Sequence, residues 1–175
     1  MNLDIKEKLK LIKDKLIFEG EYKNGKLNGK VKEYYFNGKL KAEIEYLNGE
    51  KIKEKLYDKN NNIKFEREYL YRSKLKGKEY INGILEYEGE YLLNKKWNGK
   101  GYDKNGNVIY ELINGNGKVK EYNDYGDLIF VGEYLNGIRN GKGKEYKNGN
   151  KIFEGEYENG RRKENNYFCY IYWIY

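Results

Sequence analysis

One short block of residues recurs along the chain and constrains its fold more than any other feature. At its clearest it reads aromatic-Glu-Gly-Glu-Tyr, and one copy has valine in place of the first glutamate. The clear copies begin at Phe18, Tyr87, Phe130 and Phe153, and degenerate copies begin at Ala42, Phe65 and Tyr110. Successive copies start roughly 20 to 24 residues apart, a period typical of arrays whose units pack only against their neighbours.

Within each block, the aromatic residues and the glycine alternate with the glutamates. This is the period of a β-strand with one packed face and one solvated face. We expect the rings of successive copies to form an aromatic row that holds the array together and offers a binding face. The row comprises Phe18, Tyr22, Tyr46, Tyr69, Tyr91, Phe130, Tyr134 and Tyr157.

Asn-Gly pairs punctuate the chain on both sides of these blocks. Asn-Gly is the strongest short signal for a β-hairpin, because both central residues of the tight turn need positive φ. One set follows the blocks, at Asn24-Gly25, Asn48-Gly49, Asn136-Gly137 and Asn159-Gly160. A second set closes the units, at Asn37-Gly38, Asn82-Gly83, Asn105-Gly106 and Asn148-Gly149. The sequence therefore predicts an all-β fold, an elongated single-layer array of antiparallel β-hairpins over residues 18–164.

The first 17 residues follow a different pattern. Ile5, Leu9, Ile12 and Leu16 recur at helical spacing with lysines between them. This pattern predicts a short amphipathic helix over residues 1–17. We expect the helix to cap the open end of the first hairpin, with docking to a membrane or a partner as the alternative.

The last 11 residues, 165–175, form an aromatic tail that breaks the repeat. They include six aromatic side chains and the single cysteine, Cys169. Three interpretations remain open: a final capping strand, an edge that contacts a partner or membrane, or a frame-shifted remnant of a longer repeat gene. A strand this apolar would be prone to association if nothing covered it.

The residue types present leave little room for catalysis. The chain has no histidine and no threonine, one serine (Ser73) and one cysteine, so the usual nucleophile–base arrangements cannot be assembled. The same shortage argues against a metal site or a cofactor, because only carboxylates and carbonyls remain as ligands. Asp103 to Asn107 resembles a calcium loop, but its glycine comes fourth instead of sixth, which favours an ordinary turn.

The formal net charge is +7, and the two signs alternate along most of the chain. Such alternation is typical of a solvated, cross-paired surface. One stretch carries a local excess of lysine beside aromatic rings and is a candidate site for anionic lipid headgroups, with a solvated face as the alternative. We do not expect nucleic acid as a partner. The stretch comprises Lys95, Lys96, Trp97, Lys100, Lys104, Lys118 and Lys120.

The unit aromatic-Glu-Gly-Glu-Tyr-x-Asn-Gly, followed by Asn-Gly-x-Gly, resembles the MORN repeat (membrane occupation and recognition nexus). The clearest copies are residues 87–101 and 130–143, and residues 28–41 look more like the variant repeat of bacterial antitoxin and immunity proteins. The resemblance implies a rod-like or spoon-shaped hairpin array that serves protein–protein contact, self-association or attachment beside membranes. It implies no chemistry.

Together these patterns predict a non-enzymatic scaffold that binds a protein partner or forms a homo-oligomer. Peripheral binding to anionic membrane lipids and neutralisation of a toxin, as an antitoxin or immunity protein, are the alternatives. The single cysteine and the absence of a long apolar run favour the cytoplasm, with peripheral membrane attachment as the alternative.

Overall fold

The computed structural model describes residues 5–12, 15–71 and 73–163, and it contains only β-strands and turns over these residues. The fifteen strands are β1 (Ile5–Ile12), β2 (Lys15–Lys23), β3 (Lys26–Tyr34), β4 (Leu40–Leu47), β5 (Glu50–Tyr57), β6 (Ile63–Tyr69), β7 (Lys74–Ile81), β8 (Ile84–Leu92), β9 (Lys95–Tyr102), β10 (Val108–Leu112), β11 (Gly117–Tyr122), β12 (Leu128–Leu135), β13 (Ile138–Lys147), β14 (Asn150–Glu158) and β15 (Arg161–Arg162).

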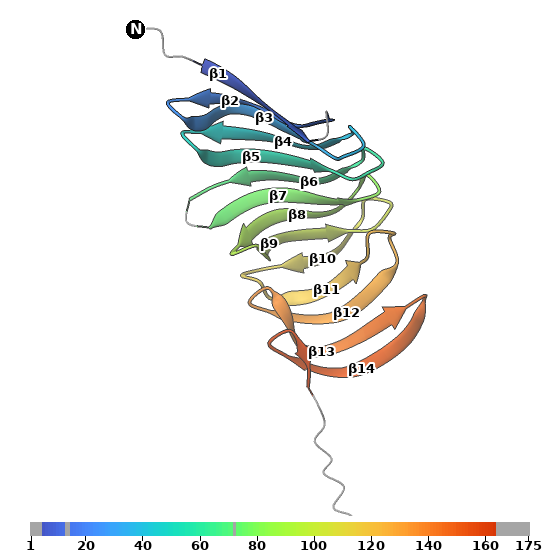
Figure 1. The fold of residues 1–175 in the computed structure, drawn as a ribbon. Coiled ribbons are helices and arrows are strands. Elements are labelled where there is room, and N and C mark those ends of the chain that lie inside the picture. The colour runs from blue at the N-terminus through green and yellow to red at the C-terminus, as the bar shows by residue number, and fades with distance from the viewer. Residues whose placement is uncertain (1–4, 13–14, 72, 164–175) are drawn as a thin grey trace, which may run out of the picture.

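The strands follow one another in space in the order of the chain. They form a ten-stranded sheet, β1 to β10, and a five-stranded sheet, β11 to β15, in which every neighbouring pair is antiparallel. Only the single bridge between Ile113 and Asn116 joins β10 to β11. The strands are stacked along the length of the molecule, so β1 and β14 lie at opposite ends (Figure 1). The predicted all-β array of consecutive hairpins is confirmed.

The predicted N-terminal helix is wrong over the part of residues 1–17 that can be compared. Ile5–Ile12 forms β1, which pairs with β2 and places Ile5 opposite Lys23. Lysine at every second position from Lys6 to Lys10 also has the period of a strand, and the open edge of β2 offers backbone partners. A short helix has no such support from tertiary packing. The predicted tail, 165–175, lies outside the described residues.

Glycines opposite one another let the strands carry large rings on one face. Gly77, Gly89 and Gly99 are successive cross-strand partners. A Cβ atom on Gly89 would lie 2.2 Å from the carbonyl oxygen of Asn98 and 2.7 Å from the hydroxyl oxygen of Tyr87. The space above the glycine row is therefore already occupied by the aromatic side chain and the neighbouring backbone.

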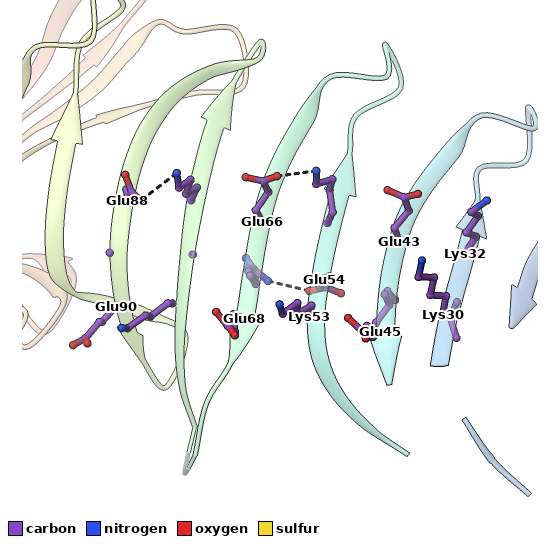
Figure 2. A pocket seen from close by; sticks show the side chains of 18 residues that line it. Lys30, Lys32, Glu43, Glu45, Lys53, Glu54, Glu66, Glu68, Glu88 and Glu90 are labelled. Carbon is purple, nitrogen blue, oxygen red and sulfur yellow. Dashed lines mark ion pairs between the residues drawn. The ribbon is translucent and has the colours of Figure 1, made fainter. Parts of the chain in front are cut away.

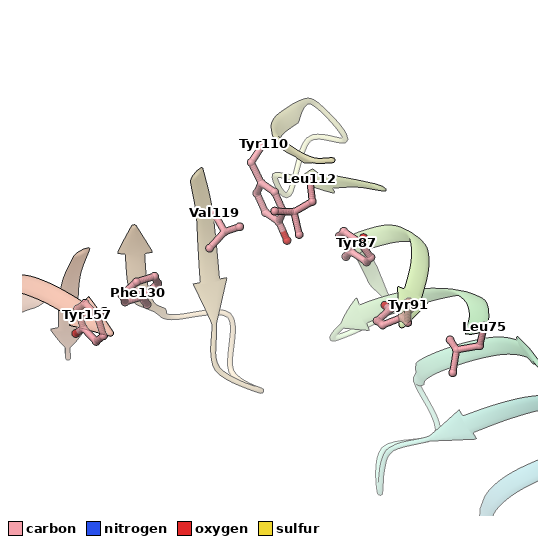
Figure 3. Packing of buried hydrophobic residues seen from close by; sticks show 8 residues of the cluster. All are labelled: Leu75, Tyr87, Tyr91, Tyr110, Leu112, Val119, Phe130 and Tyr157. Atoms are coloured by element: carbon pink, nitrogen blue, oxygen red, sulfur yellow. The ribbon is translucent and has the colours of Figure 1, made fainter. Parts of the chain in front are cut away.

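The two faces of the sheets are chemically distinct. One carries rows of lysine and glutamate (Figure 2), and the other carries the buried rings and aliphatic side chains (Figure 3). We call them the charged face and the aromatic face. Tyr87 and Phe130 on the aromatic face are fully buried. Their rings meet neighbouring rings edge-on, with 5.5 Å between the centroids of Tyr87 and Tyr91 and 5.2 Å between those of Phe130 and Tyr157.

The aromatic core continues across the break between the two sheets. Its main cluster extends from Leu75 in β7 to Tyr157 in β14 and includes Leu112 and Val119, which lie on either side of the break. A smaller cluster of Val31, Ala42 and Ile44 fills the first units. Side-chain packing thus joins strands that share only one backbone bridge.

The third unit lacks its glycine without losing its register. Arg67 stands where glycine stands in the clear copies, which predicts a bulge or kink near residues 65–76. Within the described residues β6 and β7 show no bulge, because they pair without a register shift from Phe65 to Tyr69. The cross-strand partner of Arg67 is Glu54, which is 7% exposed and lies 3.8 Å from the guanidinium. A pair of opposite charges thus replaces a pair of glycines.

Candidate functional site

Lysine and glutamate alternate from strand to strand across the charged face from β3 to β8. From β3 to β8 the even strands carry two glutamates at alternate positions and the odd strands carry two lysines, so each cross-strand pair in these rows joins opposite charges. The first charged row runs Glu19, Lys32, Glu43, Lys55, Glu66, Lys78, Glu88, Lys100, Glu111. The second charged row runs Lys30, Glu45, Lys53, Glu68, Lys76, Glu90, with Asn98 after it.

A groove of about 660 Å³ lies between the two charged rows, from β3 to β8. Its walls are the long side chains of the two rows, seen as two parallel lines in Figure 2. Its floor is the backbone of the residues between them, such as Ile44, Gly77 and Gly89. Six lysines and six glutamates stand on the walls, so the groove carries no net formal charge.

The first charged row is largely paired within the molecule. Lys55 lies 2.8 Å from Glu66 and Lys78 lies 3.2 Å from Glu88. Glu43 accepts a hydrogen bond of 2.6 Å from the Tyr57 hydroxyl, and burial together with this bond raises the pKa of Tyr57 to about 12. This tyrosine therefore remains a neutral donor at ordinary pH. The first row therefore consists largely of ion pairs and hydrogen bonds within the molecule.

A further tyrosine–glutamate pair extends this pattern toward the N-terminal end. The Tyr34 hydroxyl donates to Glu19 at 2.6 Å, and that bond raises the pKa of Tyr34 to about 12. Tyr34 and Tyr57 each lie two residues after a lysine of the first row. The repeat thus places a hydroxyl donor at the outer side of the groove wall in successive units.

The second charged row is open. Within the part of the chain that the structure describes, Lys30, Lys53 and Lys76 have no carboxylate within ion-pairing distance. Glu90 accepts a hydrogen bond from the side-chain amide of Asn98 at 3.0 Å. Exposed single charges of this kind stabilise a fold very little. The lysines of the second row are therefore free to contact charged groups of another molecule.

The predicted aromatic row lies on the aromatic face, away from the groove. Tyr91, Phe130 and Tyr157 are buried, and the other members are half-buried. The Tyr91 hydroxyl is buried among these rings, and burial raises its pKa strongly. The rings therefore hold the units together and present little free surface to a partner.

The predicted anion-binding residues lie at several separate places. Lys95 and Lys104 lie at opposite ends of the same strand, because Lys95 is the first residue of β9 and Lys104 lies in the turn after it. Lys100, Lys118 and Lys120 belong to the charged face, where Lys100 and Lys118 lie opposite glutamates of the neighbouring strands. These lysines do not form one basic patch.

Lys96, also predicted for that patch, is part of the aromatic face. Its ammonium group lies 2.7 Å from Glu86 and 3.0 Å from Glu79, and 4.5 Å from the centre of the Tyr87 ring. Trp97 lies against the turn at Gly115, where an added Cβ would meet its ring at 2.9 Å. Both side chains therefore serve the fold.

A second cavity, of about 280 Å³, is lined by Glu86, Lys96, Tyr110 and Glu121 among others. The Tyr110 hydroxyl donates a hydrogen bond to Glu86 at 3.1 Å. Burial, together with the nearby Glu86, raises the pKa of Tyr110. Glu121 is held by Arg139 at 2.8 Å. The charged groups around this cavity satisfy one another, as in a structural ion-pair cluster.

The loop from Asp103 to Asn107 uses its carboxylate internally. Asp103 Oδ1 accepts hydrogen bonds of 2.9 Å from the backbone amides of Asn105 and Asn107. Hydrogen bonding to Asn107 lowers the pKa of Asp103. This is the geometry of an Asx-stabilised turn. Over the described residues, there is no group of three or more acidic or cysteine side chains arranged to hold a metal ion.

Sequence patterns identify the aromatic face but do not by themselves reveal the groove. The signal for it is nevertheless readable: Lys-x-Lys and Glu-x-Glu alternate from Lys30 to Glu90, with a change of sign at each strand. Recognising it requires the register, because only the register shows that the like-charged pairs of neighbouring strands lie side by side.

Comparisons with known proteins do not assign the chain to a family: no family model and no curated protein matches it at a significant level. Over the described residues, the structure contains no helix of the length and hydropathy that would cross a membrane.

Proposed function

We propose that this chain is a non-catalytic scaffold that binds a protein partner, or a second copy of itself, through the groove of its charged face. The observation that carries the proposal is the open groove between β3 and β8, with walls of alternating sign and no net charge. The resemblance of its units to MORN repeats agrees with this role.

Charge balance supports a protein over a polyanion as the ligand. Nucleic acids and anionic membranes present charges of one sign, and their binding depends on an excess of basic groups. In this groove each lysine has a glutamate as its neighbour on the next strand. A protein surface with charges of both signs can match such a wall, and mismatched surfaces are repelled.

The length of the groove also suits a protein segment. Five strand-to-strand steps separate β3 from β8, which is about 24 Å at ~4.8 Å per step. The fold already holds this face in place, because the aromatic core lies on the other side of the same strands. A partner would therefore bind a pre-formed surface, which lowers the entropic cost of binding.

A pull-down from cells of the source organism, combined with light scattering of the purified chain, tests the proposal. We expect the chain either to recover a protein or to be a dimer. We expect the double variant Lys53→Glu, Lys76→Glu, which makes the second charged row acidic, to lose that interaction. Lys104→Glu, in a turn outside the groove, is the matched control and should retain it.

Vesicle flotation separates the membrane alternative from the scaffold. Vesicles with phosphatidylserine or phosphoinositides should leave the chain in the lower fraction at physiological salt. A monomer that recovers no protein and floats with these vesicles contradicts the scaffold proposal and supports peripheral membrane binding. Recovery of a toxin as the partner would specify the scaffold as an antitoxin.

A further inference from the structure

A line of exposed aliphatic side chains follows one margin of the charged face. Each lies just before, or in, the turn that closes a block of the repeat, and each is 46% to 68% exposed. At the two terminal units the equivalent residues are charged, Lys23 and Glu158. We call the line the aliphatic stripe; it comprises Leu47, Leu70, Leu93, Ile113 and Leu135.

Backbone hydrogen bonds connect several of the turns that carry the stripe to the neighbouring unit. The amide of Gly49 donates to the carbonyl oxygen of Leu27 at 2.8 Å, and the amide of Leu93 donates to that of Ser73 at 3.1 Å. The amide of Gly137 donates to the carbonyl oxygen of Gly115 at 2.8 Å, which continues the connection beyond the break between the sheets. The turns of Leu70 and Leu93, and those of Ile113 and Leu135, are therefore joined by backbone hydrogen bonds.

Leu93 shows that one member is held at a conformational cost. It occupies the turn position that asparagine occupies in the other tight turns, and its φ is 51°. Asparagine tolerates the left-handed region, whereas leucine adopts it rarely and at a cost of about 1–2 kcal/mol. Leu93 is nevertheless 68% exposed, so no burial in the described structure offsets the strain. Strain of this kind is typical of positions that serve binding.

The spacing of the stripe matches that of an α-helix. Successive members are two strands apart, about 9.6 Å, and a heptad of an α-helix rises about 10.5 Å. The second charged row lies beside the stripe at Leu47, because Glu45 and Leu47 are two residues apart in β4. Leu70 directly follows β6, two residues after Glu68, and Leu93 lies in the turn after β8, three residues after Glu90. The second charged row changes sign every ~4.8 Å, and one flank of a helix presents a side chain every ~5.3 Å.

An extended peptide fits only one of these two spacings. A polyproline II helix repeats every three residues, about 9.3 Å, which matches the stripe. On each flank, however, a polyproline II helix presents only one side chain per ~9.3 Å. Its side chains could therefore contact only every second charged residue of the second row. An α-helix meets both the apolar and the charged spacing.

From these spacings we infer that the aliphatic stripe and the second charged row together bind an amphipathic α-helix of a protein partner. The helix has an apolar residue at each heptad, and acidic and basic residues alternate at every third or fourth position along one flank. This inference rests on the proposed scaffold function and specifies its ligand. The region where both features coincide extends from Leu47 to Leu93.

The test uses the full chain and a fluorescent synthetic helix of three heptads. The probe has leucine at each a position, lysine at each b position, glutamate at each e position, and alanine or glutamine elsewhere. We expect its anisotropy to rise on titration with the chain. A probe with glutamine in place of the leucines, or with lysine at both b and e, should bind at least tenfold more weakly.

Variants of the chain locate the binding site. Leu70→Glu with Leu93→Asn should weaken probe binding at least tenfold. Leu93→Asn alone should leave the melting temperature unchanged or raised, because asparagine suits the turn. Ile84→Glu with Ile152→Glu removes two exposed aliphatic side chains at the opposite ends of the strands and should change binding less than twofold.

Two results overturn the inference. One is no rise in anisotropy at any chain concentration up to about a hundred micromolar; the other is an equal loss of binding in the stripe variants and the Ile84 and Ile152 variants. If cells supply a partner that wild type and the stripe variant recover equally, the helix site is wrong and the scaffold function stands. If the chain is monomeric and recovers no protein, the scaffold function itself fails.

Discussion

Tyr87 and Glu88 are neighbours in the chain, yet they lie on opposite faces of β8. Tyr87 is fully buried against Tyr91, whereas Glu88 pairs with Lys78 in solvent. We expect Tyr87→Ala to lower the free energy of unfolding by about 4 kcal/mol, because it leaves a large cavity. Glu88→Ala should lower it by less than about 1 kcal/mol. Urea titration followed by tyrosine fluorescence measures both, and equal midpoints would contradict the assignment of faces.

Glu54 is a buried glutamate on the aromatic face that balances the half-buried Arg67. Burial opposes its charge, but the bonds from Lys51 at 2.7 Å and from the Tyr69 hydroxyl at 2.8 Å outweigh that effect and lower its pKa. We expect Glu54→Gln to destabilise the chain by about 3 kcal/mol, because Arg67 loses its counter-charge. Glu68→Gln, on the open second row, should cost less than about 0.5 kcal/mol. A similar loss in both variants would show that Arg67 does not need Glu54.

At the scale of strands and turns, the glycine row sets how closely the strands and rings approach. Gly89→Ala would place a Cβ against the backbone of Asn98 and Gly99, so we expect a loss of about 3 kcal/mol from overpacking. Gly25→Ala has free space around it but a φ of 76°, and it should cost about 1 kcal/mol. Thermal unfolding of the two variants compares them. A larger effect at Gly25 would mean that turn conformation outweighs strand packing.

Sequence patterns predict the strands and the turns because Asn-Gly pairs and alternating rings act locally. Asn24, Asn48, Asn136 and Asn159 all adopt positive φ, as the hairpin signal requires. The N-terminal segment could not be assigned in this way, because its apolar residues fit a helix and its lysines fit a strand. The open edge of β2, which decides between them, belongs to the tertiary structure. The break after β10 falls in the degenerate copy of the repeat that begins at Tyr110.

At the scale of the whole molecule, stability should be flat near neutral pH. The chain has no histidine, the residue whose ordinary pKa lies closest to neutrality. Bonds from Lys55 and Tyr80 lower the pKa of Glu66 from 4.5. The stabilisation that this carboxylate gives to the folded state is therefore complete above about pH 5 and is lost as the pH falls through the lowered pKa. Tyr34 and Tyr57 have raised pKa values of about 12. The stabilisation from these two hydroxyl groups is therefore lost only as the pH rises from 10 through 12.

Equilibrium unfolding at a series of pH values tests this profile. We expect a plateau of the unfolding free energy from about pH 5 to pH 10, with a decline on each side. A transition between pH 6 and pH 8 would contradict it, because none of the ionisable groups with shifted pKa values changes its charge in that range.

The groove belongs to this largest scale, which explains why single motifs do not reveal it. No residue of the second charged row is unusual by itself. The row becomes a wall only because six strands place Lys30 to Glu90 in one line, and the members of the adjoining stripe come together only because successive hairpins stack in register. The predicted lysines do not form one patch for the matching reason: Lys95 and Lys104 lie at opposite ends of β9, and Lys96 and Lys100 lie on opposite faces of it.

Amide hydrogen exchange, with and without the partner that the chain recovers, tests the central claim most directly. The claim is that the aromatic face stabilises the fold and that the charged face binds the protein partner. We predict slower exchange on binding in β3 to β8 and in the turns at Leu47, Leu70 and Leu93. Protection confined to the last two strands, β14 and β15, or to the stretch from Lys95 to Lys120, would contradict it.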